Sequence, residues 1–332
     1  RNGIDIMTTE TTCLSSIWIT DEEVKHHYDI HERPQDFKEL KPGDVAYYDM
    51  MIRIDLSSQE AMIALPFHPS NAVTIHELQA DPVGILTRIE EDAKKRFGDK
   101  VDVHLVDKVV DGKVYADQGI IAGCSGGTYD NLAEAGAILK GKSIGNDYFT
   151  ASAYPQSTPV SMAVTREGIT ADLIEAGVVM KPAFCGPCFG AGDVPSNNGL
   201  SIRHTTRNFP NREGSKPGQG QLSLVALMDA RSIAATAANG GAITAATDVE
   251  YENTHKPYAY DEKIYKCRVY NGYGRPRPET ELRYGPNIKD WPTMYAMQEN
   301  MLLELAAVIH DPVTTTDELI PVSYTHLTLP TI

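Results

Sequence analysis

The chain has 332 residues, of which 42% are hydrophobic, and a formal net charge of −15 at pH 7. A chain of this length can bury a full hydrophobic core and can hold more than one domain. The acidic balance argues against a nucleic-acid partner, because a phosphate backbone needs a basic protein face.

Hydropathy and cysteine usage argue against membrane-spanning, secreted and disulfide-rich proteins. No stretch approaches the roughly 20 continuous apolar residues of a membrane-spanning helix, and no secretory signal pattern opens the chain. Five cysteines, an odd number, do not suit a disulfide scaffold in so long a chain. We therefore expect a soluble, cytoplasmic protein with no membrane partner and with thiols available to a metal.

The first 80 residues are predicted to be the end of a preceding α/β domain. We predict strands there over 47–56 and 61–67. Residues 78–98 include Pro82 and a charged run, and they predict a surface helix that leads into a second domain. We place the domain boundary near residue 80.

Strands and helices alternate in the second domain, which we assign to residues 81–310. Alternation of this kind is typical of an α/β fold with a parallel sheet and helices on both faces. The predicted strands cover 119–122, 149–154 and 178–180. The first and last predicted helices cover 130–140, with Gly141 closing the end, and 224–239. Between them we predict a helix opened by Thr158 and Pro159 and a short helix capped by Thr170.

Three cysteines follow the predicted strands. Cys124 comes after 119–122, and Cys185 and Cys188 come after 178–180 on a turn with Gly186 and Pro187. Open parallel sheets bind ligands at the carboxyl ends of their strands. Three thiolates without an obvious fourth suit a cluster metal that keeps one position open. From spacing alone, two alternatives stay open, namely a redox pair and a zinc site completed by Cys13, Cys267 or a histidine.

A local basic run lies just downstream of the cysteine pair. It is either a solvated loop or an anion clamp, and the nearby cysteines favour the clamp. Arginine forks bind carboxylates bidentately, so a clamp beside a metal implies a di- or tricarboxylate ligand. The run contains Arg203, His204, Arg207, Arg212 and Lys216.

These motifs together resemble the aconitase superfamily, the iron-sulfur hydro-lyases. The family has a lone cysteine in a glycine-rich loop, then Cys-Gly-Pro-Cys, then Arg-Asn-Phe-x-x-Arg, and this chain has all three in that order. The resemblance implies an aconitase-type fold of α/β/α layers with parallel sheets. It also implies a 4Fe-4S cluster at the carboxyl ends of the strands.

Individual site residues follow from the resemblance. Cys124, Cys185 and Cys188 match the three cluster ligands, which leaves the fourth iron for the substrate. Arg207 and Arg212 match the two carboxylate-binding arginines. Glu10 matches the active-site glutamate when Asp21 and Glu22 set the register. Two departures, Thr206 and Ile6 where the family has asparagine, weaken citrate as the substrate.

The sequence near both ends of the chain leads us to expect that it is a fragment of a longer protein. Residues 311–321 resemble the start of the link to the family's swivelling domain, which normally lies in the same chain and supplies the catalytic base. The family's acid groups lie in an N-terminal domain that this chain lacks, so we expect the fragment alone to be inactive. Residues 322–332 resemble a translated sequencing adapter, so we expect authentic sequence to end near Pro321.

The predicted function is that of a cluster-dependent hydratase/dehydratase, a carbon-oxygen lyase that adds water to or removes it from a small polycarboxylate. The runner-up in this class is an isopropylmalate-type dehydratase large subunit. An RNA-binding regulatory form without the cluster is an alternative of another class, and the net charge of −15 counts against it. A structural zinc module is the third hypothesis. Metal analysis would distinguish it from the cluster-dependent enzyme.

Overall fold

The structure is a computed structural model that describes residues 2–9, 15–146, 148–210, 221–281, 283–284, 294–306, 308 and 310. It divides into two compact units, of which the larger extends to Asp261 and the smaller begins at Glu262. Within the described part of the smaller unit, the only helix is α10 (Lys263–Arg268). None of the helices in these ranges is both long enough and apolar enough to cross a bilayer.

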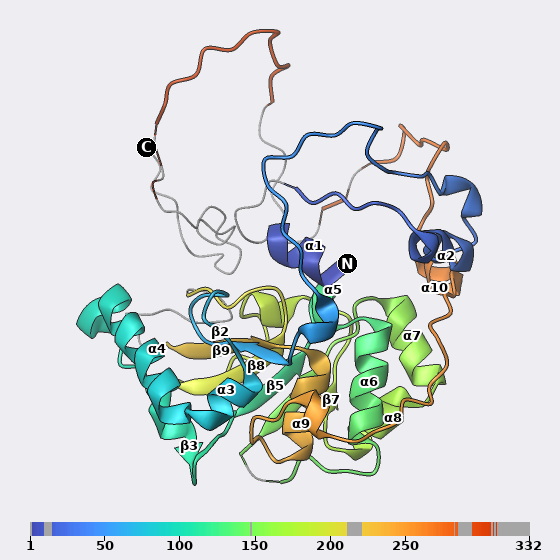
Figure 1. The fold of residues 1–332 in the computed structure, drawn as a ribbon. Coiled ribbons are helices and arrows are strands. Elements are labelled where there is room, and N and C mark those ends of the chain that lie inside the picture. The colour runs from blue at the N-terminus through green and yellow to red at the C-terminus, as the bar shows by residue number, and fades with distance from the viewer. Residues whose placement is uncertain are drawn as a thin grey trace. The chain divides into compact units, whose positions relative to one another are not determined.

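A seven-stranded sheet organises the larger unit (Figure 1). Five neighbouring strands run parallel, from β9 to β7, and β1 pairs antiparallel with both β9 and β2. The parallel sheet predicted from the sequence is therefore confirmed. In spatial order the strands are β2 (Ala72–Thr74), β1 (Met62–Ala64), β9 (Ser223–Met228), β8 (Gly199–His204), β5 (Gln118–Ile121), β6 (Thr150–Ala153) and β7 (Val179–Met180).

The sheet crosses the boundary that the sequence predicts near residue 80. Strands β1 and β2 precede that boundary, yet they are hydrogen-bonded into the same sheet through the pairing of Ile63 with Met228. The predicted strand over 47–56 is wrong, since that stretch has no strand and ends where the 3-10 turn η2 (Leu56–Ser58) begins. The predicted helix over 78–98 is two helices, α3 (Ile75–Ala80) and α4 (Pro82–Phe97).

Local capping explains where these helices begin. Thr74 and Glu77 form a capping box at the start of α3, and the Asp81 side chain accepts from the Gly84 amide at the start of α4. Pro82 occupies the first turn of α4, where its missing N–H costs no hydrogen bond. Asp81 therefore both ends α3 and starts α4.

Three further helices follow the prediction with corrected ends. They are α6 (Tyr129–Leu139), α7 (Thr158–Arg166) and α8 (Ile169–Glu175). The caps of α7 and α8 are Ser157 and Gly168, one and two residues before the predicted Thr158 and Thr170. Gly141 does follow the end of α6 with a positive φ of 69°, a conformation that glycine adopts without strain.

The predicted helix over 224–239 is wrong in its first half. Leu224 to Met228 belong to β9, whose six residues are all buried, and α9 (Ala230–Ala238) begins only after the capping residue Asp229. A parallel strand covered on both faces has a continuous apolar sequence, which periodicity cannot separate from a buried helix. Helix α9 packs against α6 and against β5 and β8.

The remaining short elements lie around this framework. These elements are the strands β3 and β4, which form a separate hairpin, and several short helices and single 3-10 turns. They are α1 (Asn2–Thr9), α2 (Glu22–Ile30), η1 (Pro34–Asp36), η3 (Gly98–Lys100), η4 (Val106–Lys108), β3 (Val109–Val110), β4 (Lys113–Val114), α5 (Gly123–Gly126), η5 (Gly186–Cys188) and η6 (Ala246–Asp248).

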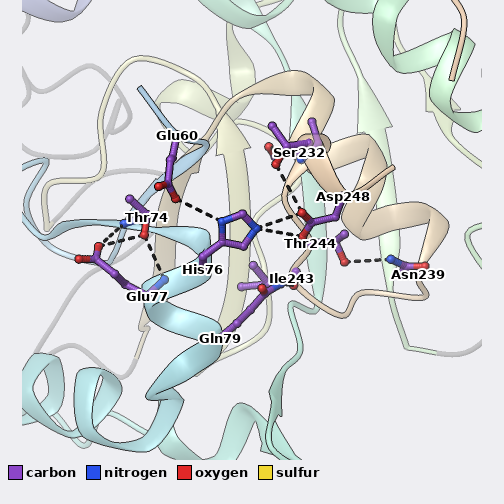
Figure 2. Close-up of polar contacts among 12 residues, drawn as sticks. Glu60, Thr74, His76, Glu77, Gln79, Ser232, Asn239, Ile243, Thr244 and Asp248 are labelled. Carbon is purple, nitrogen blue, oxygen red and sulfur yellow. Dashed lines mark hydrogen bonds and ion pairs between the residues drawn. The ribbon is translucent and has the colours of Figure 1, made fainter. Parts of the chain in front are cut away.

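A polar network fastens α3 to the segment after α9. Figure 2 shows His76 between two carboxylates, with Nδ1 3.2 Å from Glu60 Oε2 and Nε2 3.0 Å from Asp248 Oδ1. In the same region the Gln79 amide donates to the Ile243 carbonyl at 3.0 Å. The hydrogen bonds to Asp248 and then to Glu60 raise the pKa of His76 above its ordinary value of 6.5.

This network predicts a pH-dependent stability. The charged imidazolium is favoured in the folded protein, so its contribution is fully present below pH 6.5 and is lost as the pH rises through the raised pKa. We expect the wild type to have a higher urea midpoint than His76→Gln. The difference between the two midpoints should be largest below pH 6.5 and should shrink as the pH rises. Replacing the exposed His26 by Gln is the control, and a margin that is constant with pH would contradict the prediction.

Candidate metal centre

Cys124 lies on a tight turn at the carboxyl end of β5. The strand ends at Ile121, and the single-turn helix α5 carries Cys124. The Asn131 side chain donates to the carbonyls of Ser125 and Gly126, both at 3.0 Å, and so holds the end of this turn. Gly123, with a φ of 73°, provides the backbone conformation that starts the turn without steric cost.

Two glycines let this turn lie directly on the neighbouring strands. A Cβ at Gly126 would stand 2.0 Å from the carbonyl oxygen of His204, at the end of β8. A Cβ at Gly127 would stand 2.1 Å from the carbonyl oxygen of Tyr154, just after β6. Side chains at either position would push the Cys124 turn away from the sheet.

Cys185 and Cys188 lie on a second turn at the carboxyl end of β7. The Cys188 amide donates to the Cys185 carbonyl at 3.1 Å, and the Ala191 amide closes back onto the Gly186 carbonyl at 3.0 Å. Cys185 is exposed, whereas Cys188 is buried with 3% of its surface accessible. The turn therefore directs its two thiols into different environments.

The two turns meet. A Cβ at Gly123, the neighbour of Cys124, would lie 3.5 Å from the Cys188 sulfur. Burial, and next the charge of the Cys185 thiolate, raise the pKa of the Cys124 thiol. Cys124 is thus a neighbour of Cys185 and Cys188 at one edge of the sheet. About sixty residues of chain, which include α6, α7 and α8, separate Cys124 from the pair.

The chemistry of this donor set fits an iron-sulfur cluster, since soft thiolates are the ligands that such clusters use. None of the four described cysteines is in a disulfide. Among the residues with described positions, no three His, Cys, Asp or Glu side chains are arranged to hold a metal ion.

Buried hydroxyls surround the Cys124 turn. Among the described residues, Ser125 Oγ, Thr205 Oγ1 and Thr206 Oγ1 have no hydrogen-bond partner. Ser125 and Thr205 line a cavity of about 490 Å³, together with apolar side chains such as Met62 and Leu227. Buried hydroxyls rarely stay unpaired, so this edge of the sheet offers hydrogen bonds to a polar ligand.

The structure describes three residues of the basic run, and they lie in different surroundings. Arg203 lies in β8 and is fully buried, so the alternative of a solvated loop is wrong for this residue. His204 is half-buried, and its burial lowers the pKa of its imidazole, which favours the neutral form. Arg207 is half-buried just after β8. Arg212 and Lys216 lie outside the described residues, as do Glu10 and Cys13.

Sequence reasoning missed the anchor of the Arg207 segment. The buried Asn208 side-chain amide donates to the carbonyls of Ala64 and Leu65, at 3.2 and 2.7 Å, and the main-chain carbonyl of Asn208 accepts from the Phe67 amide. These bonds fix the segment after β8 to the end of β1. Asn208 stands between Arg207 and Phe209, so no local apolar pattern marks it as a buried amide.

Comparisons with known proteins agree with the motifs. Residues 1–235 match the model of the aconitase family (aconitate hydratase). The 3-isopropylmalate dehydratase large subunit of Campylobacter hominis is 27% identical over 228 residues, 68% of this chain and 47% of that protein. The 3-isopropylmalate dehydratase large subunit 2 of Rubrobacter xylanophilus is 29% identical over 241 residues, which are 72% of this chain and 47% of that protein. The chain thus spans less than half the length of these relatives.

The close approach of Gly127 to β6 yields a prediction. A methyl group at this position overlaps the Tyr154 carbonyl, so we expect Gly127→Ala to lower the free energy of unfolding by about 1–3 kcal/mol, the usual cost of overpacking. Urea denaturation measures the change. The matched control is Gly43→Ala, where the nearest heavy atom to the added Cβ is 4.0 Å away. Equal stability of the two variants would contradict the close packing of the Cys124 turn.

Proposed function

Because the chain belongs to the aconitase family, we propose that Cys124, Cys185 and Cys188 bind a 4Fe-4S cluster in a hydratase/dehydratase of small di- or tricarboxylates. One observation carries the proposal. Cys124 lies close to the pair Cys185 and Cys188, which is far from it in sequence, at the carboxyl ends of β5 and β7, where a parallel sheet binds its ligand. The free thiols suit a reducing compartment, so we propose the cytoplasm as its location.

We propose distinct roles for the residues around the thiols. When bound, the cluster supplies a Lewis-acidic iron for a hydroxyl and a carboxylate of the substrate. Arg207 and Arg212 would bind the substrate's carboxylates through their planar forks. Ser125 and Thr205 have buried hydroxyls that can donate to substrate oxygens. Glu10 would take the place of the family's active-site glutamate.

The substrate and the rest of the protein belong to the proposal as well. The names of the relatives favour an isopropylmalate-type dehydratase among the possible members of the family. The segment 311–321, outside the described residues, instead favours a swivelling domain fused in the same chain. Activity assays of the full-length protein with citrate and with isopropylmalate would separate these two members of one reaction class.

The first test concerns the cluster ligands. We expect anaerobically purified protein to contain four iron and four sulfide per chain, and Cys124→Ser or Cys185→Ser to abolish that content. Serine is a harder and poorer ligand for iron, and two thiolates cannot retain the cluster. Iron and sulfide analysis measures the outcome, with Cys267→Ser as the control because Cys267 is exposed on α10. Full iron in Cys124→Ser would refute the ligand assignment, and zinc without sulfide would favour a structural zinc module.

The second test concerns the carboxylate-binding arginines and needs the full-length protein. Arg207→Lys keeps the charge and loses the fork, so we expect kcat/KM to fall roughly ten- to hundredfold while the iron content stays unchanged. Arg166→Lys is the matched control, since Arg166 pairs with Asp261 on the surface at 2.7 Å. Normal turnover by Arg207→Lys would show that Arg207 does not bind the substrate.

A further inference from the structure

We propose that Arg203 is a positioning residue that clamps the Cys185–Cys188 turn onto the sheet and so fixes where Cys188 stands. Arg203 is completely buried in β8, where it pairs with Ile120 of β5 and Leu227 of β9. A fully buried guanidinium is rare in proteins unless it has several hydrogen-bond partners. The proposal rests on the proposed function only for its link to the cluster, because the clamp itself is a feature of the protein without cofactor.

The guanidinium binds both ends of the segment that follows Cys185. Its Nη1 donates to the carbonyl of Pro187, inside the cysteine turn, at 2.6 Å. Its Nη2 donates to the carbonyl of Asp193, five residues after Cys188, at 2.7 Å. A single planar group therefore closes the loop between these two carbonyls, which a lysine with one ammonium cannot do in the same geometry.

The sheet holds the guanidinium in place from the other side. Nε donates to Ser201 Oγ at 2.8 Å, and Nη2 also reaches Gln118 Oε1 at 3.2 Å. Ser201 Oγ in turn donates to the same Gln118 oxygen at 2.7 Å. Arg203 thus links β5 and β8 to the cysteine turn through acceptors on both strands.

A second contact holds the far end of the loop. The Tyr154 hydroxyl donates to Asp193 Oδ2, and Ser152 Oγ donates to Asp193 Oδ1 at 3.3 Å. Asp193 is therefore held by Arg203 through its carbonyl and by the β6 region through its carboxylate. The loop is fastened to three adjacent strands, with Cys188 buried inside it and Cys185 exposed at its edge.

Loss of the fork should open this loop without unfolding the sheet. We expect Arg203→Lys and Arg203→Met to speed alkylation of Cys188 by iodoacetamide roughly ten- to hundredfold in cluster-free protein, because hydrogen bonds to a charged group then no longer oppose local opening. Alkylation of the exposed Cys185 and Cys267 should stay at the wild-type rate. Arg166→Met, which breaks a surface ion pair, is the matched control and should leave Cys188 protected.

Amide exchange in β9 separates positioning from general stability. If Cys188 becomes reactive while the β9 amides keep their protection, Arg203 acts on the loop. If Cys188 alkylation and β9 amide exchange speed up together, Arg203 is an ordinary core residue and the proposal is overturned. Should the Arg203 variants not fold, Ser201→Ala removes one support of the fork and should speed Cys188 alkylation severalfold. Wild-type protection of Cys188 in Ser201→Ala and in every folded Arg203 variant would also overturn the proposal.

Cluster retention gives the link to function. In reconstituted protein, we expect Arg203→Lys to lose iron to a chelator faster than the wild type and Arg166→Lys to lose it at the wild-type rate. Equal iron loss from Arg203→Lys and the wild type would overturn the clamp's role at the cluster. The alkylation experiment uses cluster-free protein, so it decides the role of Arg203 in the loop even if the wild type proves to bind no cluster.

Discussion

The parallel pairing of β5 with β6 on one side and β8 on the other is the constraint on which the site depends. It aligns Ile121 with Ala153 and His204, so the turns that follow these strands leave the sheet at one edge. Gly126 and Gly127 then allow the Cys124 turn to rest on the backbone of both neighbours. The position of Cys124 is thus set by main-chain hydrogen bonds and close packing, and not by its own side chain.

The same edge concentrates polar groups that a hydrophobic core would exclude. Arg203 is buried among carbonyl and hydroxyl acceptors, and the hydroxyls of Ser125 and Thr205 are buried without partners in the described part of the chain. Buried polar groups cost stability unless they are paired, so a fold tolerates unpaired ones mainly where a ligand completes them. The polar edge of the sheet therefore contrasts with the apolar interior, where Leu132 of α6 and Leu224 of β9 are fully buried.

Much of this architecture could be predicted from sequence, and the failures have physical causes. The strand before Cys124 and helix α6 were predictable because local pattern and packing agree there. Strand β8 escaped prediction because its Arg203 and His204 suggested a charged surface, whereas tertiary hydrogen bonds bury the arginine. The first half of 224–239 was mistaken for helix because burial on both faces erases periodicity. The motifs singled out Cys124, Cys185 and Cys188, but the approach of the two cysteine turns depends on strand order, which no local pattern contains.

Strand β7 is the edge of the sheet and pairs with β6 only over Val179 and Met180. Protein structures open most readily at such short peripheral pairings, whereas central strands exchange only on global unfolding. Local opening at this edge therefore separates β7 from β6 while the Cys185–Cys188 loop stays attached to β5 and β8 through Arg203, so the two ends of the segment 179–188 differ in local stability.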